Sequence, residues 1–334
     1  MSKTFRKIVL NSRPEGTPKA KNFKILTDEI GDPAQGQVLI ETRYVSVDPY
    51  MRGRMNDRKS YVPPYELGEV ISGGAMGKVT KFASSEVNEG DWVIGNWGWQ
   101  EMSLSDANTV RKIDDDTHSI TAYMSILGMT GLTAYFGLLD IGKPKEGETV
   151  AVSGAAGAVG SVVGQLAKLK GARVVGIAGS ETKIKYLTNE LGFDAAINYK
   201  EVNDIYEAIG DACPDGVDIY FDNVGGAISD AVMAHINLNA RIVICGQISL
   251  YNLEKPDVGP RIQPQILINR AMMKGFIIGD YQDQFETGLK ELSKWLSDNK
   301  LSYRETITNG FENISKAFLG LFKGENIGKQ LVEL

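Results

Sequence analysis

A glycine-rich segment near the middle of the chain has the spacing of a phosphate-binding loop. The apolar residues 149–153 predict a strand, which leads into Gly154-Ala155-Ala156-Gly157-Ala158-Val159-Gly160 and then into a predicted helix over 158–170. Glycines at these positions let the backbone approach a pyrophosphate and let the helix pack closely on the strand. The amino end of the helix offers free N–H groups and a positive dipole. The segment therefore predicts a dinucleotide site.

The loop is a variant of G-x-G-x-x-G, because Ala155 replaces the usual first glycine. By itself, a run of glycine and alanine is equally consistent with tight helix packing. The strand before it, the helix after it and five further predicted strands favour the dinucleotide-binding interpretation.

The end of the next predicted strand indicates which dinucleotide fits. NAD sites place Asp or Glu about 20 residues further on, where it binds the 2′-hydroxyl of the adenine ribose. Here Gly179 and Ser180 stand at that place, followed by Glu181 and Lys183. Small residues leave room for a 2′-phosphate, to which Ser180 can donate a hydrogen bond and whose charge Lys183 can neutralise. The pattern favours NADP, although Glu181 could also turn toward the ribose and Lys183 could be an ordinary solvated charge.

Metal and thiol chemistry have few candidate residues. The only cysteines are Cys213 and Cys245, and the only histidines are His118 and His235. This scarcity argues against a disulfide framework and a zinc site. The acidic run Asp114–Asp116 beside His118 is typical of a solvated turn before a helix. Cys245 stands at the carboxyl end of a predicted strand, where it either contacts the cofactor or is a buried core cysteine. We therefore expect no metal.

The reaction should accordingly need little acid–base machinery from the protein. Hydride addition to a conjugated C=C bond fits this description, because the neighbouring carbonyl spreads the developing charge as an enolate. The protein then orients the enone, donates a hydrogen bond to the enolate oxygen and excludes water.

The elements that position these residues fall into two regions. Residues 1 to about 115 are predicted to be β-rich, with glycine-bearing breaks at 73–74, Gly77 and 90–91, as in a barrel or sandwich. The predicted strands are 5–10, 38–44, 67–71, 92–94 and 110–113. After Gly147, strands alternate with helices, predicted over 158–170, 182–191 and 227–236, which predicts an α/β fold with a doubly wound parallel sheet. The predicted strands of this second region are 149–153, 173–178, 195–199, 217–224, 241–246 and 274–279.

Composition sets further limits. The 334 residues carry 42 acidic and 36 basic side chains, a formal charge of −6, which gives no electrostatic case for nucleic-acid binding. The uncharged stretches 119–139 and 149–167 contain glycine and hydrophilic residues, so they are expected to be buried core and not membrane spans. We expect a cytoplasmic protein with a small-molecule substrate.

Several longer motifs carry a specific resemblance. They are Asp48-Pro49-Tyr50-Met51-Arg52, Gly128-Met129-Thr130-Gly131-Leu132-Thr133-Ala134-Tyr135, the loop at 155–160, Asn198-Tyr199-Lys200, Phe221-Asp222-Asn223-Val224-Gly225-Gly226, Ile244-Cys245-Gly246 and Gly324-Glu325-Asn326-Ile327-Gly328-Lys329. From about residue 5 to its end, the chain resembles the zinc-independent medium-chain dehydrogenase/reductase superfamily. Within it, the chain is most similar to the prostaglandin reductase (leukotriene hydroxydehydrogenase) branch, which includes bacterial curcumin reductases and plant alkenal double-bond reductases.

The resemblance implies a GroES-like catalytic domain over 1–125, completed by 300–334, and a Rossmann NADP-binding domain over 126–299. It implies NADPH as the cofactor, reduction of alkenals or enones and a homodimer. The backbone of 156–160 would hold the pyrophosphate. Lys183 and Tyr199 would lie at the 2′-phosphate with Ser180 and Gly179 nearby. Toward the nicotinamide the resemblance places Thr130, Asn223, Cys245, Gly246 and Asn326.

Two tyrosines match residues that face substrate in such proteins. Tyr50 and Tyr251 each carry a phenol that can donate to an enolate oxygen or relay a proton. The alternative for Tyr50 is a turn-packing aromatic beside Pro49, and Tyr251 could equally be structural. The loop 253–265 carries three prolines and is a candidate lid. An NADPH-dependent quinone oxidoreductase and a non-catalytic NADPH-binding protein stay open as alternative functions.

Overall fold

The computed structural model describes residues 2–113 and 117–334, and the predicted acidic turn at 114–116 lies outside them. Contacts divide the chain into two compact units. Unit 1 contains residues 1–124, 306–326 and 330–334, and unit 2 contains residues 125–305 and 327–329. The carboxyl-terminal segment therefore contributes to both units.

Unit 2 is built on a six-stranded sheet in the order β10-β9-β8-β11-β12-β13, in which all neighbours are parallel. The strands are β8 (Thr149–Ser153), β9 (Arg173–Ala178), β10 (Ala195–Asn198), β11 (Val217–Asp222), β12 (Ile236–Ile244) and β13 (Met272–Gly275). The chain runs outward from β8 to one edge and then returns to add β11 on its other side. This doubly wound arrangement confirms the predicted fold class. In such sheets ligands bind beyond the carboxyl ends of the strands where the order reverses, which are β8 and β11 here.

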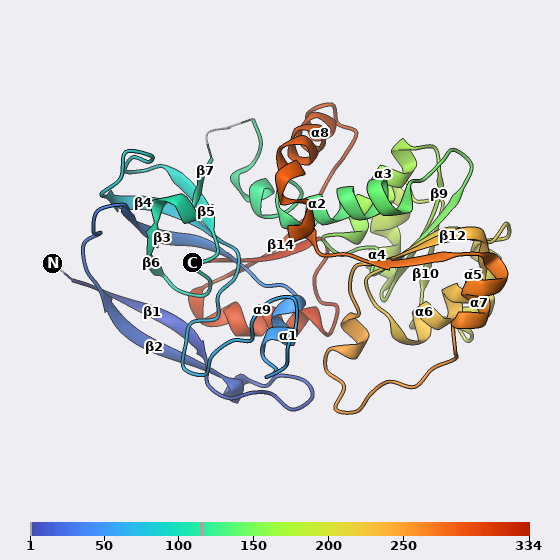
Figure 1. Ribbon diagram of the computed structural model, residues 1–334, viewed down its shortest axis with the longest axis horizontal. Coiled ribbons are helices and arrows are strands. Elements are labelled where there is room, and N and C mark those ends of the chain that lie inside the picture. Colours follow the sequence, from blue (N-terminus) through green and yellow to red (C-terminus); the bar gives the residue numbers. More distant parts are fainter. Residues whose placement is uncertain (1, 114–116) are drawn as a thin grey trace. The chain divides into compact units, whose positions relative to one another are not determined.

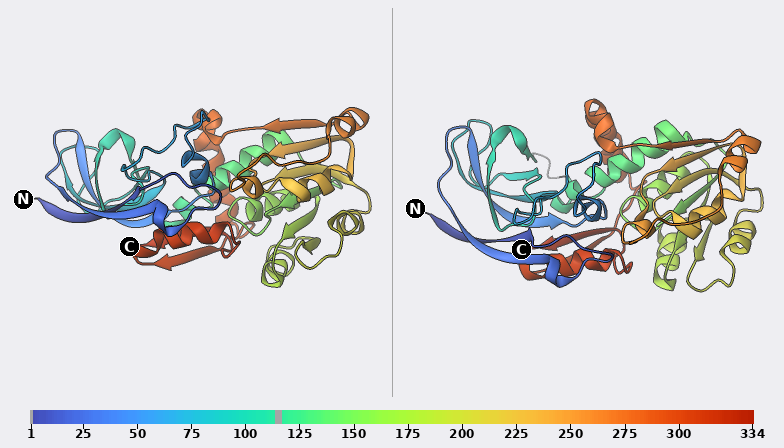
Figure 2. Two further views of the ribbon diagram at one scale, coloured as in Figure 1. Left: turned by 90° about the horizontal axis from the view of Figure 1, so that it is seen from below. Right: turned by 60° about the horizontal axis from the view of Figure 1, so that its bottom comes forward.

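Helices cover both faces of this sheet, as Figures 1 and 2 show. On one face lie α2 (Met129–Phe136), α3 (Gly160–Leu169) and α8 (Phe285–Ser297), and on the other lie α5 (Ile205–Ala212), α6 (Gly226–Met233) and α7 (Gln263–Asn269). The short helix α4 (Glu181–Lys185) follows β9. Because both faces are covered, β8 is buried at every residue. This explains why the strands appear in the sequence as continuous apolar runs.

Unit 1 is β-rich, as predicted. Its larger sheet has seven strands in the order β14-β15-β3-β4-β5-β7, with β6 also paired to β3, and β1 and β2 form a separate antiparallel pair. The strands are β1 (Lys3–Leu10), β2 (Phe23–Ile30), β3 (Gln37–Ser46), β4 (Ala75–Phe82), β5 (Trp92–Gly95), β6 (Met102–Asp106), β7 (Arg111–Lys112), β14 (Glu305–Asn309) and β15 (Lys329–Glu333). Among the described residues of this unit, the α-helices are α1 (Tyr50–Arg54) and α9 (Ile314–Leu321). Their apolar residues join a core that includes Met51, Trp99 and Phe318.

The structure corrects some predicted elements. The apolar run 67–71 is not a strand; only Val70 makes an isolated bridge. Conversely, β4 runs through Gly77, which was expected to be a break. A Cβ at Gly77 would lie 2.3 Å from the Glu41 carbonyl oxygen, so glycine is what allows β3 and β4 to approach. The helix expected over 182–191 ends as an α-helix at Lys185 and continues as a wider π-helical turn.

Neither uncharged stretch forms a membrane span. In the described part of the chain, no helix combines the length and apolar character needed to cross a bilayer.

Candidate cofactor and substrate site

The phosphate loop joins β8 to α3 through a tight turn. Gly154 has a positive φ of 59°, and the Gly157 N–H donates to the Gly154 carbonyl oxygen at 3.0 Å. A Cβ at Gly160 would lie 2.5 Å from that same oxygen. Glycine at 160 is therefore required for the start of α3 to pack against the end of β8, which is the role predicted for it.

The amino end of α3 is open to an anion. Its N-cap residue is Val159, and no side chain caps the helix. The neighbouring Ala156 and Ala158 have no polar side chains that could do so. The first N–H groups of a helix lack intrahelical partners, and together with the helix dipole they attract negative charge. The loop thus fits a pyrophosphate, to which the backbone N–H groups of 156 and 158–160 can donate, while the Gly157 N–H is already bonded to Gly154.

A segment from the carboxyl terminus borders this loop, which the sequence did not predict. Gly328 bridges to Gly157, and its N–H donates to the Ala156 carbonyl oxygen at 2.8 Å. Gly328 has a positive φ of 65°, and a Cβ there would lie 1.8 Å from the Arg304 carbonyl oxygen. Only glycine fits this position. The neighbouring Asn326, predicted to contact the cofactor, belongs to unit 1.

At the ends of β9 and β10, the residues predicted for the 2′-phosphate come together. A Cβ at Gly179 would lie 2.8 Å from Cε1 of Tyr199, so the tyrosine ring packs on the bare glycine backbone. Ser180 caps α4, and its Oγ accepts the Lys183 N–H at 3.4 Å. The serine hydroxyl proton can therefore donate outward. We call this group, with Lys200, the adenosine corner.

Lys200 belongs to this corner, although sequence reasoning did not assign it a role. Its Cε lies 3.1 Å from the position of a Cβ at Gly179, and its Nζ lies 5.9 Å from the centre of the Tyr199 ring. The pKa of Lys183 is lowered by burial and, to a smaller extent, by the charge of Lys200. Two nearby cations suit a doubly charged phosphate. The sequence signal that could have identified Lys200 is its position directly after Tyr199, at the end of the same predicted strand.

Glu181 was the residue that made NADP uncertain. In the structure its carboxylate lies 3.6 Å from Nζ of Lys185, one helical turn along α4. This arrangement removes the main objection to a phosphate at the adenosine corner.

The ends of β8, β11 and β12 form a second group, which we call the central crevice. Asn223 follows β11, donating its backbone N–H to Ser153 Oγ at 2.9 Å and its Nδ2 to the Ser153 carbonyl oxygen at 2.7 Å. The N–H groups of Cys245 and Gly246 donate to the Asp222 carbonyl oxygen at 2.9 and 3.1 Å. These bonds hold three strand ends together and leave a surface made largely of backbone.

Cys245 is unsuited to nucleophilic chemistry. Burial, followed by the negative charge of Asp222, raises the pKa of its thiol to about 12. The thiol therefore stays protonated at neutral pH. At the end of β12, Cys245 can therefore either pack in the core or contact the cofactor.

Tyr251 lies over the backbone of the central crevice. Its hydroxyl oxygen accepts the Gln247 N–H at 3.2 Å and lies 3.4 Å from the position of a Cβ at Gly246. Burial raises the pKa of the Tyr251 phenol, so the hydroxyl keeps its proton.

Thr130, at the start of α2, is buried and donates its hydroxyl to the Ser125 carbonyl oxygen at 2.9 Å.

Tyr50 lies in unit 1, at the start of α1. Burial and the nearby Asp48 carboxylate raise the pKa of its phenol well above the ordinary value, so it also remains a hydrogen-bond donor. Its hydroxyl lies 3.8 Å from the position of a Cβ at Gly73. The neighbouring Tyr65 donates to the Ser72 carbonyl oxygen at 2.7 Å.

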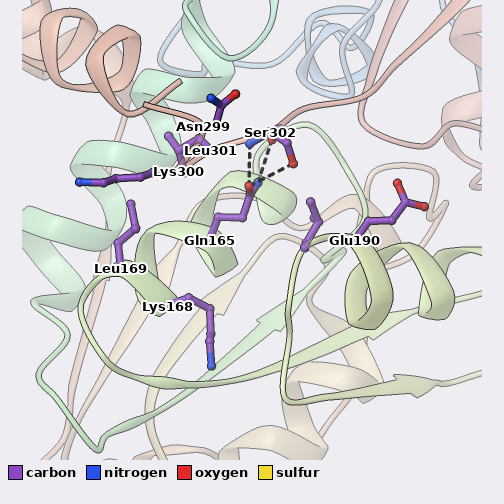
Figure 3. A pocket seen from close by; sticks show the side chains of 9 residues that line it. Gln165, Lys168, Leu169, Glu190, Asn299, Lys300, Leu301 and Ser302 are labelled. Carbon is purple, nitrogen blue, oxygen red and sulfur yellow. Dashed lines mark hydrogen bonds between the residues drawn. The ribbon is translucent and has the colours of Figure 1, made fainter. Parts of the chain in front are cut away.

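A separate pocket lies at the opposite end of α3 from the phosphate loop (Figure 3). Gln165 spans it, accepting the Ser302 N–H at 2.8 Å and donating to the Ser302 carbonyl oxygen at 2.9 Å. Lys168 in its wall is paired with Asp194 at 2.9 Å. Its polar groups are already engaged, so this pocket is not part of the dinucleotide site.

For metal chemistry, residues 2–113 and 117–334 contain no group of three or more His, Cys, Asp or Glu side chains arranged to hold an ion.

Comparison with known proteins places this site among oxidoreductases. Two families match the chain, described as the N-terminal domain of oxidoreductase over residues 6–113 and as zinc-binding dehydrogenase over residues 158–294. YfmJ of Bacillus subtilis (strain 168), named as a presumed NADP-dependent oxidoreductase, is 58% identical over 336 residues, covering 100% of this chain and 99% of its own length.

Other relatives carry more specific names. The NADPH-dependent curcumin reductase of Escherichia coli (strain K12) is 44% identical, covering 98% of this chain and 96% of its own length. Prostaglandin reductase 1 of Rattus norvegicus is 44% identical, covering 96% of each chain. The crystal structure of CurA from Vibrio vulnificus in complex with NADPH matches with a TM-score of 0.93 and 44% identity over 98% of both chains.

Proposed function

Because this chain belongs to the zinc-independent medium-chain dehydrogenase/reductases, in the branch of the curcumin and prostaglandin reductases, we propose that it reduces the C=C bond of α,β-unsaturated aldehydes and ketones with NADPH. The family predicted from the sequence is thereby confirmed. The observation that carries the proposed reaction is the pairing of a complete dinucleotide cradle with the protonated phenol of Tyr251 above the central crevice.

NADPH supplies the hydride when it is bound. The backbone of 156–160 binds the pyrophosphate at the uncapped amino end of α3. The adenosine corner binds the 2′-phosphate through Ser180, Lys183, Tyr199 and Lys200, and two cations at this place favour NADPH over NADH. The structure thus offers a cradle of the right chemistry at each phosphate.

The two tyrosines act on the substrate. Their pKa values are both raised, so each phenol keeps its proton. We assign to Tyr251 the hydrogen bond to the carbonyl oxygen, where negative charge develops as the enolate forms. One of them passes the proton that completes reduction at the α-carbon. Neither role requires a metal ion or a nucleophilic thiol.

The direct test is the product of the reaction. Purified protein is incubated with NADPH and, separately, with an alkenal, a cyclic enone and a curcumin-like dienone, with NADH and a quinone as controls. We expect NADPH consumption and a product that has gained two hydrogens at the C=C bond by mass spectrometry. If NADPH binds but no enone is reduced, the reductase assignment is wrong. If only the quinone is reduced, the quinone oxidoreductase alternative replaces it.

We also propose a homodimer formed along β13. This edge strand exposes all of its residues, Met272 and Met273 among them, and the adjacent α7 exposes Leu267 and Ile268. A second copy pairing there would cover both the apolar side chains and the unpaired strand edge. Light scattering should give twice the chain mass of 36.4 kDa, and Met273→Lys should reduce the measured mass to that of the monomer.

The cytoplasm is the proposed location, which a fluorescent fusion tests by microscopy.

A further inference from the structure

Asp222, at the end of β11, is a fully buried carboxylate surrounded by neutral donors. It has 0% exposure. Its Oδ1 accepts the hydroxyl groups of Ser153 at 3.0 Å and Tyr220 at 2.9 Å, and the N–H groups of Val224 at 3.0 Å and Gly225 at 2.9 Å. Its Oδ2 accepts Nε2 of Gln247 at 2.8 Å. None of the ion pairs formed by the described residues includes Asp222.

This pattern requires a carboxylate at 222. Both oxygens act as acceptors, one toward the β8–β11 side and the other toward Gln247. An asparagine has only one acceptor oxygen, so its Nδ2 would face either the donors of the loop after β11 or the amide of Gln247. The negative charge is thus held in place by the bonding pattern, with hydrogen bonds in the place of a counter-ion.

Gln247 is held from two sides. Its Nε2 also donates to the Gly246 carbonyl oxygen at 2.9 Å. Its Oε1 rests against Gly225, where a Cβ would lie only 2.2 Å away and where φ is +73°. From this fixed residue, the backbone N–H donates to the Tyr251 hydroxyl oxygen at 3.2 Å. A continuous series of contacts therefore runs from Asp222 through Gln247 to Tyr251.

We propose that Asp222 is a positioning residue which, through Gln247, aims the Tyr251 hydroxyl at the substrate. Because the phenol oxygen accepts the Gln247 N–H, the hydroxyl proton is the part left to donate. This inference rests on the proposed role of Tyr251 as a donor to the substrate. It assigns a function to Gln247, for which the sequence suggested none.

The charge of Asp222 acts in the same direction. Burial raises the pKa of the Tyr251 phenol most, the hydrogen bond from the Gln247 N–H lowers it, and Cys245 and then Asp222 add smaller increases. A neutral residue at 222 would lower that pKa toward its ordinary value, so the loss of the donor at alkaline pH should begin at lower pH.

A double-mutant cycle separates this role from a merely structural one. Tyr251→Phe should lower kcat for enone reduction about tenfold or more. Asp222→Asn and Gln247→Leu should each lower kcat by a similar factor in the wild-type background and by little in the Tyr251→Phe background. NADPH affinity, measured by fluorescence titration, should change less than threefold. Gln247→Leu keeps the cycle usable if Asp222→Asn fails to fold.

Asp218→Asn is the matched control. Asp218 also lies on β11 and accepts hydrogen bonds from a neighbouring strand, from the Thr149 N–H at 2.8 Å, but it lies at the amino-terminal end, away from Tyr251. It should leave kcat and its pH profile unchanged. As a rescue, the pair Asp222→Asn with Gln247→Glu exchanges donor and acceptor and keeps one negative charge, so it should recover part of kcat.

The outcomes are distinguishable. If the wild type reduces enones and Tyr251→Phe is slow, but the 222 and 247 variants lower kcat equally in both backgrounds, the positioning role is overturned while the proposed function stands. If Tyr251→Phe leaves kcat unchanged, the positioning role is overturned together with the role of Tyr251. If the wild type reduces no enone, the proposed function itself fails.

Discussion

The adenosine corner and the central crevice lie along the same edge of one parallel sheet, yet they are built by different means. At the corner, Tyr199 is 41% exposed, and the chemistry comes from side chains on the surface. In the crevice, Ser153 and Asp222 are fully buried, and the surface offered to a ligand is mainly backbone. Selectivity for a phosphate can therefore change without disturbing the fold, whereas the crevice cannot change without affecting stability.

The largest effect is expected in the crevice, from Asp222→Ala. This change leaves the donors of Ser153, Tyr220, Val224, Gly225 and Gln247 without their acceptor. Buried unsatisfied donors cost about 1–3 kcal/mol each, so we expect a loss of at least about 3 kcal/mol in the free energy of unfolding. Urea unfolding followed by circular dichroism measures it. A loss below about 1 kcal/mol would show that water replaces the carboxylate without penalty.

Next in size is Gly160→Val, which tests the phosphate loop between β8 and α3. The new side chain meets the Gly154 carbonyl oxygen, which must move. We expect a destabilisation of about 1–3 kcal/mol and weaker binding of NADPH and NADH by the same factor, since both carry the pyrophosphate. Gly279→Ala is the control, because a Cβ there meets no atom within 4 Å. A selective loss of NADPH alone would contradict this role.

At the corner, substitutions should change selectivity and leave stability unaltered. Lys183→Ala and Lys200→Ala should each weaken 2′,5′-ADP about 10- to 100-fold by calorimetry, with little effect on 5′-AMP. Lys185→Ala is the matched control on α4, because Lys185 is paired with Glu181. Equal losses of affinity for both nucleotides would show that these lysines do not bind the 2′-phosphate.

Tyr50 lies outside both regions and sharpens the contrast between them. Tyr50→Phe should lower enone turnover about tenfold by removing a donor to the substrate, and it should leave cofactor affinity and unfolding unchanged. Steady-state kinetics and NADPH titration test this. Unchanged turnover would assign Tyr50 to packing beside Pro49.

The smallest expected effect is a dependence on pH at the corner. The pKa of Lys183 is lowered, so its ammonium group begins to lose its proton at a lower pH than an ordinary lysine does. The value of kcat/KM for NADPH should therefore fall as pH rises through the alkaline range, while that for NADH should not. Lys183→Arg should remove this fall, because arginine stays charged. An identical fall for both cofactors would point to another group.

Local signals were enough to predict much of the fold and the phosphate loop. A strand, a glycine-rich turn and a helix depend on residues within about 20 positions of one another, and each has its own composition. Gly160, Ser180 and Lys183 were predicted on these grounds. The structure shows the close approach that requires glycine at 160 and the helix cap formed by Ser180. The misread strands had conflicting local signals, as at Gly77, where a contact with a neighbouring strand overrides the tendency of glycine to break a strand.

The order of the strands was decided only in three dimensions. It brings Ser153 within 3.0 Å of Asp222 across a separation of 69 residues, and it brings Gly328 against the phosphate loop. No local pattern encodes such pairs, because parallel neighbours are joined by long crossovers. The amino-acid sequence by itself thus determined the family, the glycine cradle and the scarcity of metal ligands and thiols. The tertiary structure determined which donors surround Asp222, why Gln247 is held still and how Lys200 joins the adenosine corner.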